Sequence, residues 1–452
     1  MTQLLALLAG LPTPPHAPDF GGLLGHRIAI GSVFEIHILI AGAVSGATQL
    51  GPITEWLGYM RKDEKYDRLA HAMGKFTIYY FAISTFTATL LITVLLIILW
   101  GRLWTIITTI TFWPFVIEAF TFLVQVAGAY LWYYTWDRMR PYKPLHIAIG
   151  MFLAIDSFLQ VLMIDIVASY MLTPTQPGDP IKVFLNPTEM PLQIHRIVGN
   201  LAYVGFGIGA ISGFLHLRTK DPVRRVFLDW AGSYGMLWGI GMTLLQPAVG
   251  YEYAKEIQLH AYGAWYKMMW GDLSPAFLLQ IFILGLLFLV PNFYFQRRLQ
   301  RAGARGAGLL RLLTILLVVT TLFGVLPYHL AFTFDQVQAE GLNRPFWEGG
   351  LINPFGAMIP YKVSALIVFT LLSVLALVVY LRGERRIVWG QAGRGEQSLL
   401  VLVAACTTVM IVLMGYIREN GRYPDIVAGH VTQQGQQAVQ EPPSSYPSGG
   451  PP

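Results

Sequence analysis

The sequence has little charge and almost no cysteine. Only 12% of its 452 residues are charged, whereas an ordinary soluble domain carries about a quarter. The single cysteine, Cys406, excludes a disulfide framework and a cysteine-ligated metal cluster. The sequence also lacks a P-loop, a dinucleotide-binding fingerprint and a zinc-protease motif. These absences exclude a soluble enzyme and leave membrane transport or electron transfer.

Long hydrophobic runs are abundant, and 54% of the residues are hydrophobic. The runs are roughly 20 residues long, the length of a helix that crosses a bilayer core. Unpaired backbone groups are too costly in hydrocarbon, so each span must be helical. The sequence therefore predicts an all-α, polytopic transmembrane helix bundle with about ten spans: 28–50, 76–100, 112–135, 145–171, 191–217, 227–249, 274–296, 309–333, 363–381 and 397–416. Residues 101–111 either extend a neighbouring helix or form a re-entrant segment.

The basic residues alternate between successive loops. Loops one, three, five, seven and nine, counted together with Arg311 at the start of the eighth span, contain 21 of the 31 lysines and arginines. By the positive-inside rule, both termini then face outward and the net charge of +6 has a topological origin, so no nucleic-acid partner is expected. We expect an outward segment at 1–27, a transmembrane bundle at 28–423, and a polar, disordered tail at 424–452.

Several ionisable residues lie inside the predicted spans. Such groups are expensive in hydrocarbon and are functional candidates, although each could instead form an interhelical hydrogen bond. They are Glu35, His37, Glu118, Asp156, Asp165, His195 and Arg196. At 1.5 Å per residue, His195, Glu118 and His37 lie roughly 6, 9 and 14 Å from the outer face, which places all three in the outer half.

A neutral imidazole is the commonest metal ligand, and haem iron in a helical bundle is held by axial histidine or methionine. His195 and His37 are therefore candidate haem ligands, with a satisfied core histidine as the alternative. Met242 and Gln280 lie roughly 9 to 11 Å from the outer face and are candidates for the second ligand opposite His195. Plain packing is the alternative for Met242.

A series of segments resembles subunit I of the cytochrome bd quinol oxidases. The similar segments run in order over roughly residues 30–260. They are EIHILIAGAVSGATQLG, HAMGKFTIYYFAIS, FVIEAFTFLVQ followed by WDRM, KPLHIAIGMFLAIDSFLQVLM, LQIHRIVGNLAYVGFGIG and PAVGYEYAKEIQ. Each segment is weak evidence alone, but their shared order and spacing indicate more than chance similarity.

This resemblance implies roles for individual residues. His37 matches the histidine that ligates one of two haems in the family's oxygen-reducing pair, and His195 matches the ligand of the low-spin haem b. Glu118 matches a glutamate beside the oxygen-reducing haems. Glu252 lies at the edge of the loop that forms the family's quinol site, and Gln280 falls near the methionine opposite the low-spin haem histidine.

The sequence also departs from the family. Gln125 stands where the family's proton path has a second glutamate, and no acidic residue matches the family's haem ligand near Val325, although His329 lies one turn further on. The loop after span six is short, and the family's lysine and glutamate pair is not evident there. Arg418 and Arg422 lie in GYIRENGRYPDI, which resembles the family's Gly-Arg-x-Pro signature, and could pair with haem propionates. Closing a helix at the interface is the alternative role for both.

The resemblance predicts a membrane-embedded haem subunit of a respiratory oxidoreductase in a bacterial or archaeal cytoplasmic membrane. Electrons would pass from quinol, or an outward redox partner, through haem b at His195 toward a second haem b or haem d near His37. Asp156, Gln160, Asp165 and Glu118 form a candidate proton route, and a membrane subunit of the subunit II type is the expected partner. One alternative is an electron-transfer subunit that serves a cytochrome c without reducing oxygen. Another is a haem-free transporter that uses the acidic residues as a proton relay.

Overall fold

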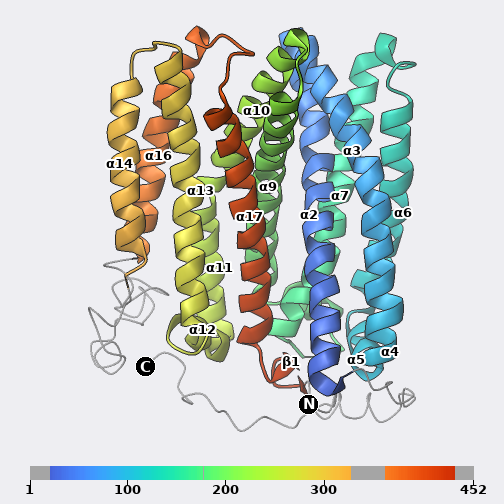
Figure 1. The fold of residues 1–452 in the computed structure, drawn as a ribbon. Helices are drawn as coiled ribbons and strands as arrows, with labels where there is room; N and C mark the ends of the chain where they lie inside the picture. The colour runs from blue at the N-terminus through green and yellow to red at the C-terminus, as the bar shows by residue number, and fades with distance from the viewer. Residues whose placement is uncertain (1–20, 177, 327–361, 433–452) are drawn as a thin grey trace. The chain divides into compact units, whose positions relative to one another are not determined.

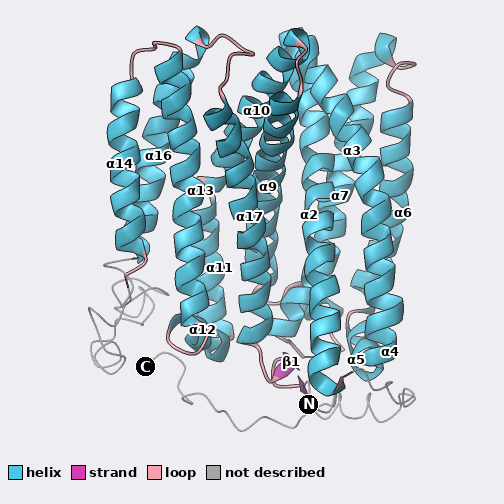
Figure 2. Ribbon diagram, in the orientation of Figure 1, coloured by secondary structure: helices cyan, strands magenta, loops and turns pink. Residues whose placement is uncertain are grey.

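The computed structural model describes residues 21–176, 178–326 and 362–432, and these are almost entirely helical (Figures 1 and 2). Contacts divide the described chain into unit 1, residues 21–200 with 418–432, and unit 2, residues 201–417. The elements are α2 (Gly22–Arg61), α3 (Glu64–Thr89), the π-helix η1 (Leu90–Leu96), α4 (Ile97–Leu99), α5 (Gly101–Ile110), α6 (Phe112–Tyr134), η2 (Arg140–Tyr142), α7 (Lys143–Leu172), α8 (Pro180–Phe184), α9 (Glu189–Arg218), α10 (Pro222–Thr243), α11 (Gln246–His260), α12 (Tyr262–Met269), α13 (Ser274–Arg301), α14 (Ala307–Gly324), α16 (Ser364–Gly383), η7 (Glu384–Arg386) and α17 (Arg394–Gly421), followed by β1 (Asp425–Val427) and β2 (Val431–Thr432).

The predicted polytopic helical fold is confirmed. Nine helical segments in the described residues are long and apolar enough to cross a membrane. The sixth predicted span corresponds to α10, a helix of 22 residues that is not among these nine. Residues 101–110, left open by the sequence, form the separate helix α5. The protein is therefore an integral, multi-pass membrane protein.

Unit 1 is built around α2, α3, α6 and α7, which lie side by side (Figure 1). The turn between α2 and α3 needs only two residues, because Lys62 adopts a left-handed conformation and the Asp63 carboxylate caps α3 by accepting the Lys65 backbone N–H at 3.0 Å. Helix α2 continues through Pro52 to Arg61, about ten residues beyond the predicted end of the first span. This extension brings Glu55 into the bundle.

The chain after α17 corrects two predicted boundaries. Residues 425–432, assigned to a disordered tail, form the antiparallel pair β1 and β2, whose turn contains Gly429 at φ 67°. The pair is ordered because the Arg422 Nη1 donates to the Ile426 carbonyl at 2.8 Å and the Ala428 N–H donates to the Met171 carbonyl at 3.0 Å. At the other end, α2 begins at Gly22, inside the segment predicted at 1–27. Residues 1–20 and 433–452 lie outside the described residues.

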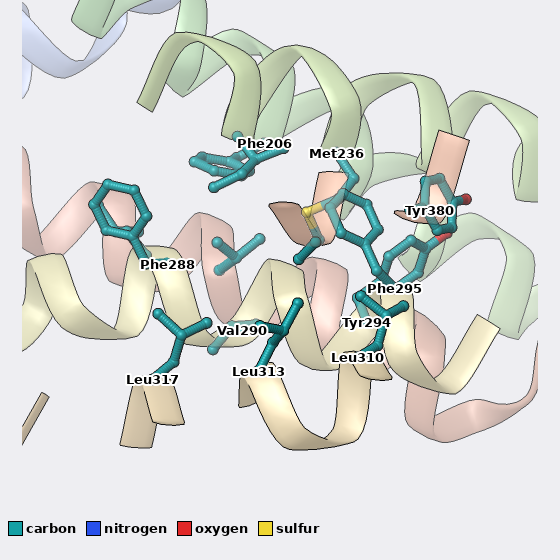
Figure 3. Close-up of a cluster of buried hydrophobic side chains, with 14 of the residues drawn as sticks. Phe206, Met236, Phe288, Val290, Tyr294, Phe295, Leu310, Leu313, Leu317 and Tyr380 are labelled. Carbon is teal, nitrogen blue, oxygen red and sulfur yellow. The ribbon is translucent and has the colours of Figure 1, made fainter. Parts of the chain in front are cut away.

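Unit 2 has its own apolar core between α10, α13, α14, α16 and α17 (Figure 3). Aromatic rings stack across it, with centroids 5.4 Å apart for Phe288 and Phe369 and 4.2 Å apart for Phe295 and Tyr380. The buried Tyr380 hydroxyl lies 2.7 Å from the Ser233 hydroxyl, so its polar end is satisfied. Stacked pairs of this kind stabilise a core beyond simple burial of area.

Candidate functional site

His37 lies on α2 and contacts α3. Its Nδ1 lies 3.0 Å from the hydroxyl of Thr87, which is buried. Among the described residues, no hydrogen bond to Nε2 is present. A half-buried imidazole with one nitrogen held and the other available is what an axial haem ligand requires.

Several charged groups gather at the end of unit 1 that contains the start of α2. The Arg27 guanidinium donates to the Asn420 side chain and lies 4.9 Å from the centroid of the Tyr423 ring. Glu35, on the same helix, lies within electrostatic range of Arg418 and Glu419. The first helix of unit 1 is thereby joined to the last turn of α17.

Arg418 and Arg422, both predicted as candidates to pair with haem propionates, differ in the partners of their guanidinium groups. The buried Arg422 donates to the Ile426 carbonyl and lies 2.5 Å from Glu419. The Nε of Arg418 is buried and meets no hydrogen-bond partner in the described part of the chain. Arg418 is therefore the better placed of the two to receive an external carboxylate.

His195 lies in the first turns of α9, beside a buried ion pair. The Arg196 Nη1 lies 2.5 Å from a carboxylate oxygen of Asp165, whose side chain is 0% exposed. Glu189, at the start of α9, is also buried and lies within electrostatic range of Asp165. Arg196 thus has a partner within the protein, and its charge is balanced before any propionate is considered.

The predicted proton-route residues lie on α6 and α7. Gln160 hydrogen-bonds the carboxylate of Glu118, which confirms that these two side chains are neighbours. Gln125 and Asp156 are buried, with 1% and 5% of their surfaces exposed. One oxygen of each, Oε1 of Gln125 and Oδ2 of Asp156, makes no hydrogen bond to the described residues. Buried oxygens of this kind are costly unless a water or a proton meets them.

The sequence did not predict a buried charged network around Glu55. The Glu55 side chain is 0% exposed, and its Oε1 lies 2.6 Å from His146 Nδ1 and 2.7 Å from Lys143 Nζ. Its other oxygen accepts from the Trp132 indole N–H at 2.9 Å. Lys143 also lies 3.0 Å from Asp67, so the network joins α2, α3, α6 and α7. Below, the Glu55 network means these five residues.

His146 is held from both of its ring nitrogens. Its Nδ1 lies 2.6 Å from the Glu55 carboxylate and its Nε2 lies 2.8 Å from the backbone carbonyl of Trp132. The side chain is 2% exposed, so the Glu55 network extends into the buried part of the helix bundle.

The remaining predicted residues belong to unit 2. Met242 on α10 and Gln280 on α13 are both half-buried, and the structure does not place them relative to His195 in unit 1. Glu252 is half-exposed and lies 2.5 Å from Lys255, which also lies 3.6 Å from Glu256. Lys255 and Glu252 therefore form an ion pair on α11. His329 lies outside the described residues.

The charges around Lys255 explain its titration. Burial lowers its pKa, but hydrogen bonds and attraction from Glu252 and Glu256 outweigh that effect and raise the pKa above its usual value. The ammonium is therefore retained at neutral and moderately alkaline pH. The pair lies on α11, within the resembling segment PAVGYEYAKEIQ.

A second buried ion pair lies in unit 2. Arg298 on α13, which the sequence placed in a basic loop, is buried and lies 3.1 Å from the fully buried Asp229. Asp229 also accepts from the Gly390 N–H at 2.8 Å and from the Gln397 amide at 3.3 Å. These contacts tie α10, α13 and α17 together.

Comparison with known proteins identifies the family. Residues 26–262, just over half of the chain, match the family described as cytochrome bd terminal oxidase subunit I. The chain belongs to this family. The fold is similar to the structure of bd oxidase from Geobacillus thermodenitrificans, with a TM-score of 0.56 and 17% identity over 81% of this chain and 99% of that one. No match is found among curated proteins.

Membership of the cytochrome bd terminal oxidase subunit I family makes the protein an oxidoreductase of the bd type, a family that uses haem and quinol and pairs with a second subunit. The matched residues include His37, Glu118 and His195. The position of His37 fits a haem ligand because its Nε2 is left available by the contacts of the other nitrogen.

Proposed function

We propose that the protein is the haem-carrying subunit of a bd-type respiratory oxidoreductase. His195, with Met242 or Gln280, would hold a haem b that would accept electrons from quinol or from an outward redox partner. His37 would hold a second haem, b or d. The observation that carries the proposal is the contact of His37 Nδ1 with Thr87, which leaves Nε2 for iron, within a stretch that matches the family.

Protein side chains would supply the remaining functions. Haem bound at these positions provides one-electron chemistry. Arg418, whose buried Nε meets no described partner, is suited to a propionate, with Arg196 and Arg422 as weaker candidates because both have internal carboxylate partners. Glu118 with Gln160, together with Asp156, Asp165 and Gln125, would line the proton route. Glu252, paired with Lys255, would lie at the quinol site.

One observation favours a second candidate, an electron-transfer subunit that does not reduce oxygen. Gln125 is buried where the family has a proton-carrying glutamate, and an amide cannot act as an acid. Such a subunit would deliver electrons to a cytochrome c or another redox partner.

A reduced-minus-oxidised spectrum of the purified complex tests these proposals. Two haems with oxygen consumption on quinol support the first proposal, and haem b without oxygen consumption supports the second. Absence of haem bands would contradict both and favour a proton-coupled transporter. His195→Ala should remove the low-spin signal, and His37→Ala should remove the other haem. His260→Ala is the matched control, because His260 is exposed and pairs with Glu256 on the same helix.

A further inference from the structure

The contact between His37 and Thr87 indicates which of the two side chains donates the hydrogen. The Thr87 hydroxyl lies 2.9 Å from the Ser84 carbonyl and 3.2 Å from the Ile83 carbonyl of its own helix. A carbonyl oxygen can only accept, and a hydroxyl has a single proton. The Thr87 proton is therefore directed to the backbone of α3, so that its oxygen accepts from the His37 ring.

The contact assigns the hydrogen on the ring. Because the Thr87 oxygen accepts and lies 3.0 Å from Nδ1, Nδ1 carries the hydrogen and Nε2 carries the lone pair.

We propose that Thr87 is a positioning residue that holds His37 in the Nδ1–H tautomer and presents Nε2 to haem iron. The proposal rests on the proposed function, because it requires that His37 is a haem ligand. A hydrogen bond from the far nitrogen fixes the ring and makes it a stronger donor to the metal. Loss of such a partner typically weakens metal binding about 10- to 100-fold.

Neighbouring threonines show that this contact is specific. Thr85 and Thr89 each donate to the carbonyl four residues earlier, at 2.9 Å, as threonines in membrane helices commonly do. Thr89 is exposed, and its hydroxyl makes no hydrogen bond outside α3 to the described residues. The π-helix η1 begins at Leu90, directly after Thr89, and π-helical turns frequently occur at functional sites.

The test uses Thr87→Val, which removes the hydroxyl at nearly constant volume, in the complete complex. We expect Thr87→Val to release the haem at His37 to apomyoglobin about 10-fold faster and to lower the iron–imidazole stretching frequency in resonance Raman spectra. Thr87→Ser should restore both values toward those of the unmodified protein. Thr89→Val, the same chemical change two residues away, should leave both unchanged.

The haem at His195 serves as the internal measure of folding, because it should keep its spectrum in every variant. If His37→Ala loses its haem but Thr87→Val matches the unmodified protein in haem release and stretching frequency, the role of Thr87 is refuted and the haem assignment stands. If His37→Ala keeps both haems, the haem assignment fails and the role of Thr87 fails with it. If Thr89→Val changes both readouts as much as Thr87→Val does, the effect belongs to α3 in general, and the proposal is overturned.

Discussion

Replacing Glu55 by glutamine removes one negative charge from the Glu55 network. Lys143, 2.7 Å away, would then keep its positive charge with only Asp67 to balance it, and His146, 2.6 Å away, would lose its carboxylate partner. The glutamine amide also places an N–H group against a donor, because Glu55 accepts a hydrogen bond from Trp132 and from Lys143. Glu55 and His146 are 0% and 2% exposed, so solvation can relieve little of either effect.

The expected magnitude follows from the burial of this carboxylate. Removing one partner of a buried ion pair typically costs about 3–5 kcal/mol, because the remaining charge is left uncompensated. For a unit of about 200 residues, each kcal/mol shifts the melting temperature by roughly 2–4 °C, so Glu55→Gln should lower it by roughly 6–20 °C. The assay is thermal unfolding of the purified protein in detergent, followed by circular dichroism.

Asp137→Asn is the matched control for this prediction. Asp137 pairs with Arg140 at 3.0 Å, but the two side chains are 79% and 73% exposed. Exposed pairs of this kind contribute little, so the control should melt within a degree or two of the unmodified protein. If Glu55→Gln also melts there, the network does not hold α2, α6 and α7 together and the reasoning is refuted. A double-mutant cycle with His146→Gln should show strong coupling between the two residues.

Two further changes test unit 2. Arg298→Met should leave Asp229 as an uncompensated buried charge and destabilise the protein by about 3–5 kcal/mol, measured by the same melting assay; an unchanged melting temperature would contradict this. Gly235→Ala should destabilise by at least about 1–3 kcal/mol through overpacking, because its Cβ would lie 2.5 Å from the Gly205 carbonyl oxygen. Gly241→Ala, where the Cβ would meet no atom within 4 Å, should not destabilise, and equal losses in both alanine variants would count against the packing argument.

The helical fold was predictable because runs of about 20 apolar residues have few alternatives in a bilayer. The ends of the helices were not, since hydropathy falls wherever a charged residue occurs. Glu55 and Arg298 both lie where a hydropathy pattern ends a span, yet both helices continue and bury them. Their ion pairs form between residues 91 and 69 positions apart, and no local pattern in the sequence reports such contacts.

The residues of the candidate site also divide into those that the sequence predicted and those that it did not. His37, His195 and Glu118 stood out because ionisable residues are rare inside apolar runs. Thr87 did not, because threonine is common in membrane helices and only the approach of α2 to α3 gives its hydroxyl a partner. Thr87 could have been found from the sequence only by searching the predicted spans for polar side chains at the same depth as His37.

The composition of unit 1 has a consequence for how the protein is made. Its first part ends at residue 200 and its last part begins at residue 418. In the last part, the Asn420 side chain accepts a hydrogen bond from Arg27, and the Ala428 N–H donates to the Met171 carbonyl. At about 5–20 residues per second, a ribosome needs roughly 10–40 s to synthesise the intervening chain. During that interval the helices of residues 21–200 are in the membrane without residues 418–432, which complete unit 1. A chaperone or the insertion machinery that binds this incomplete bundle would therefore do so before synthesis of unit 2 is complete.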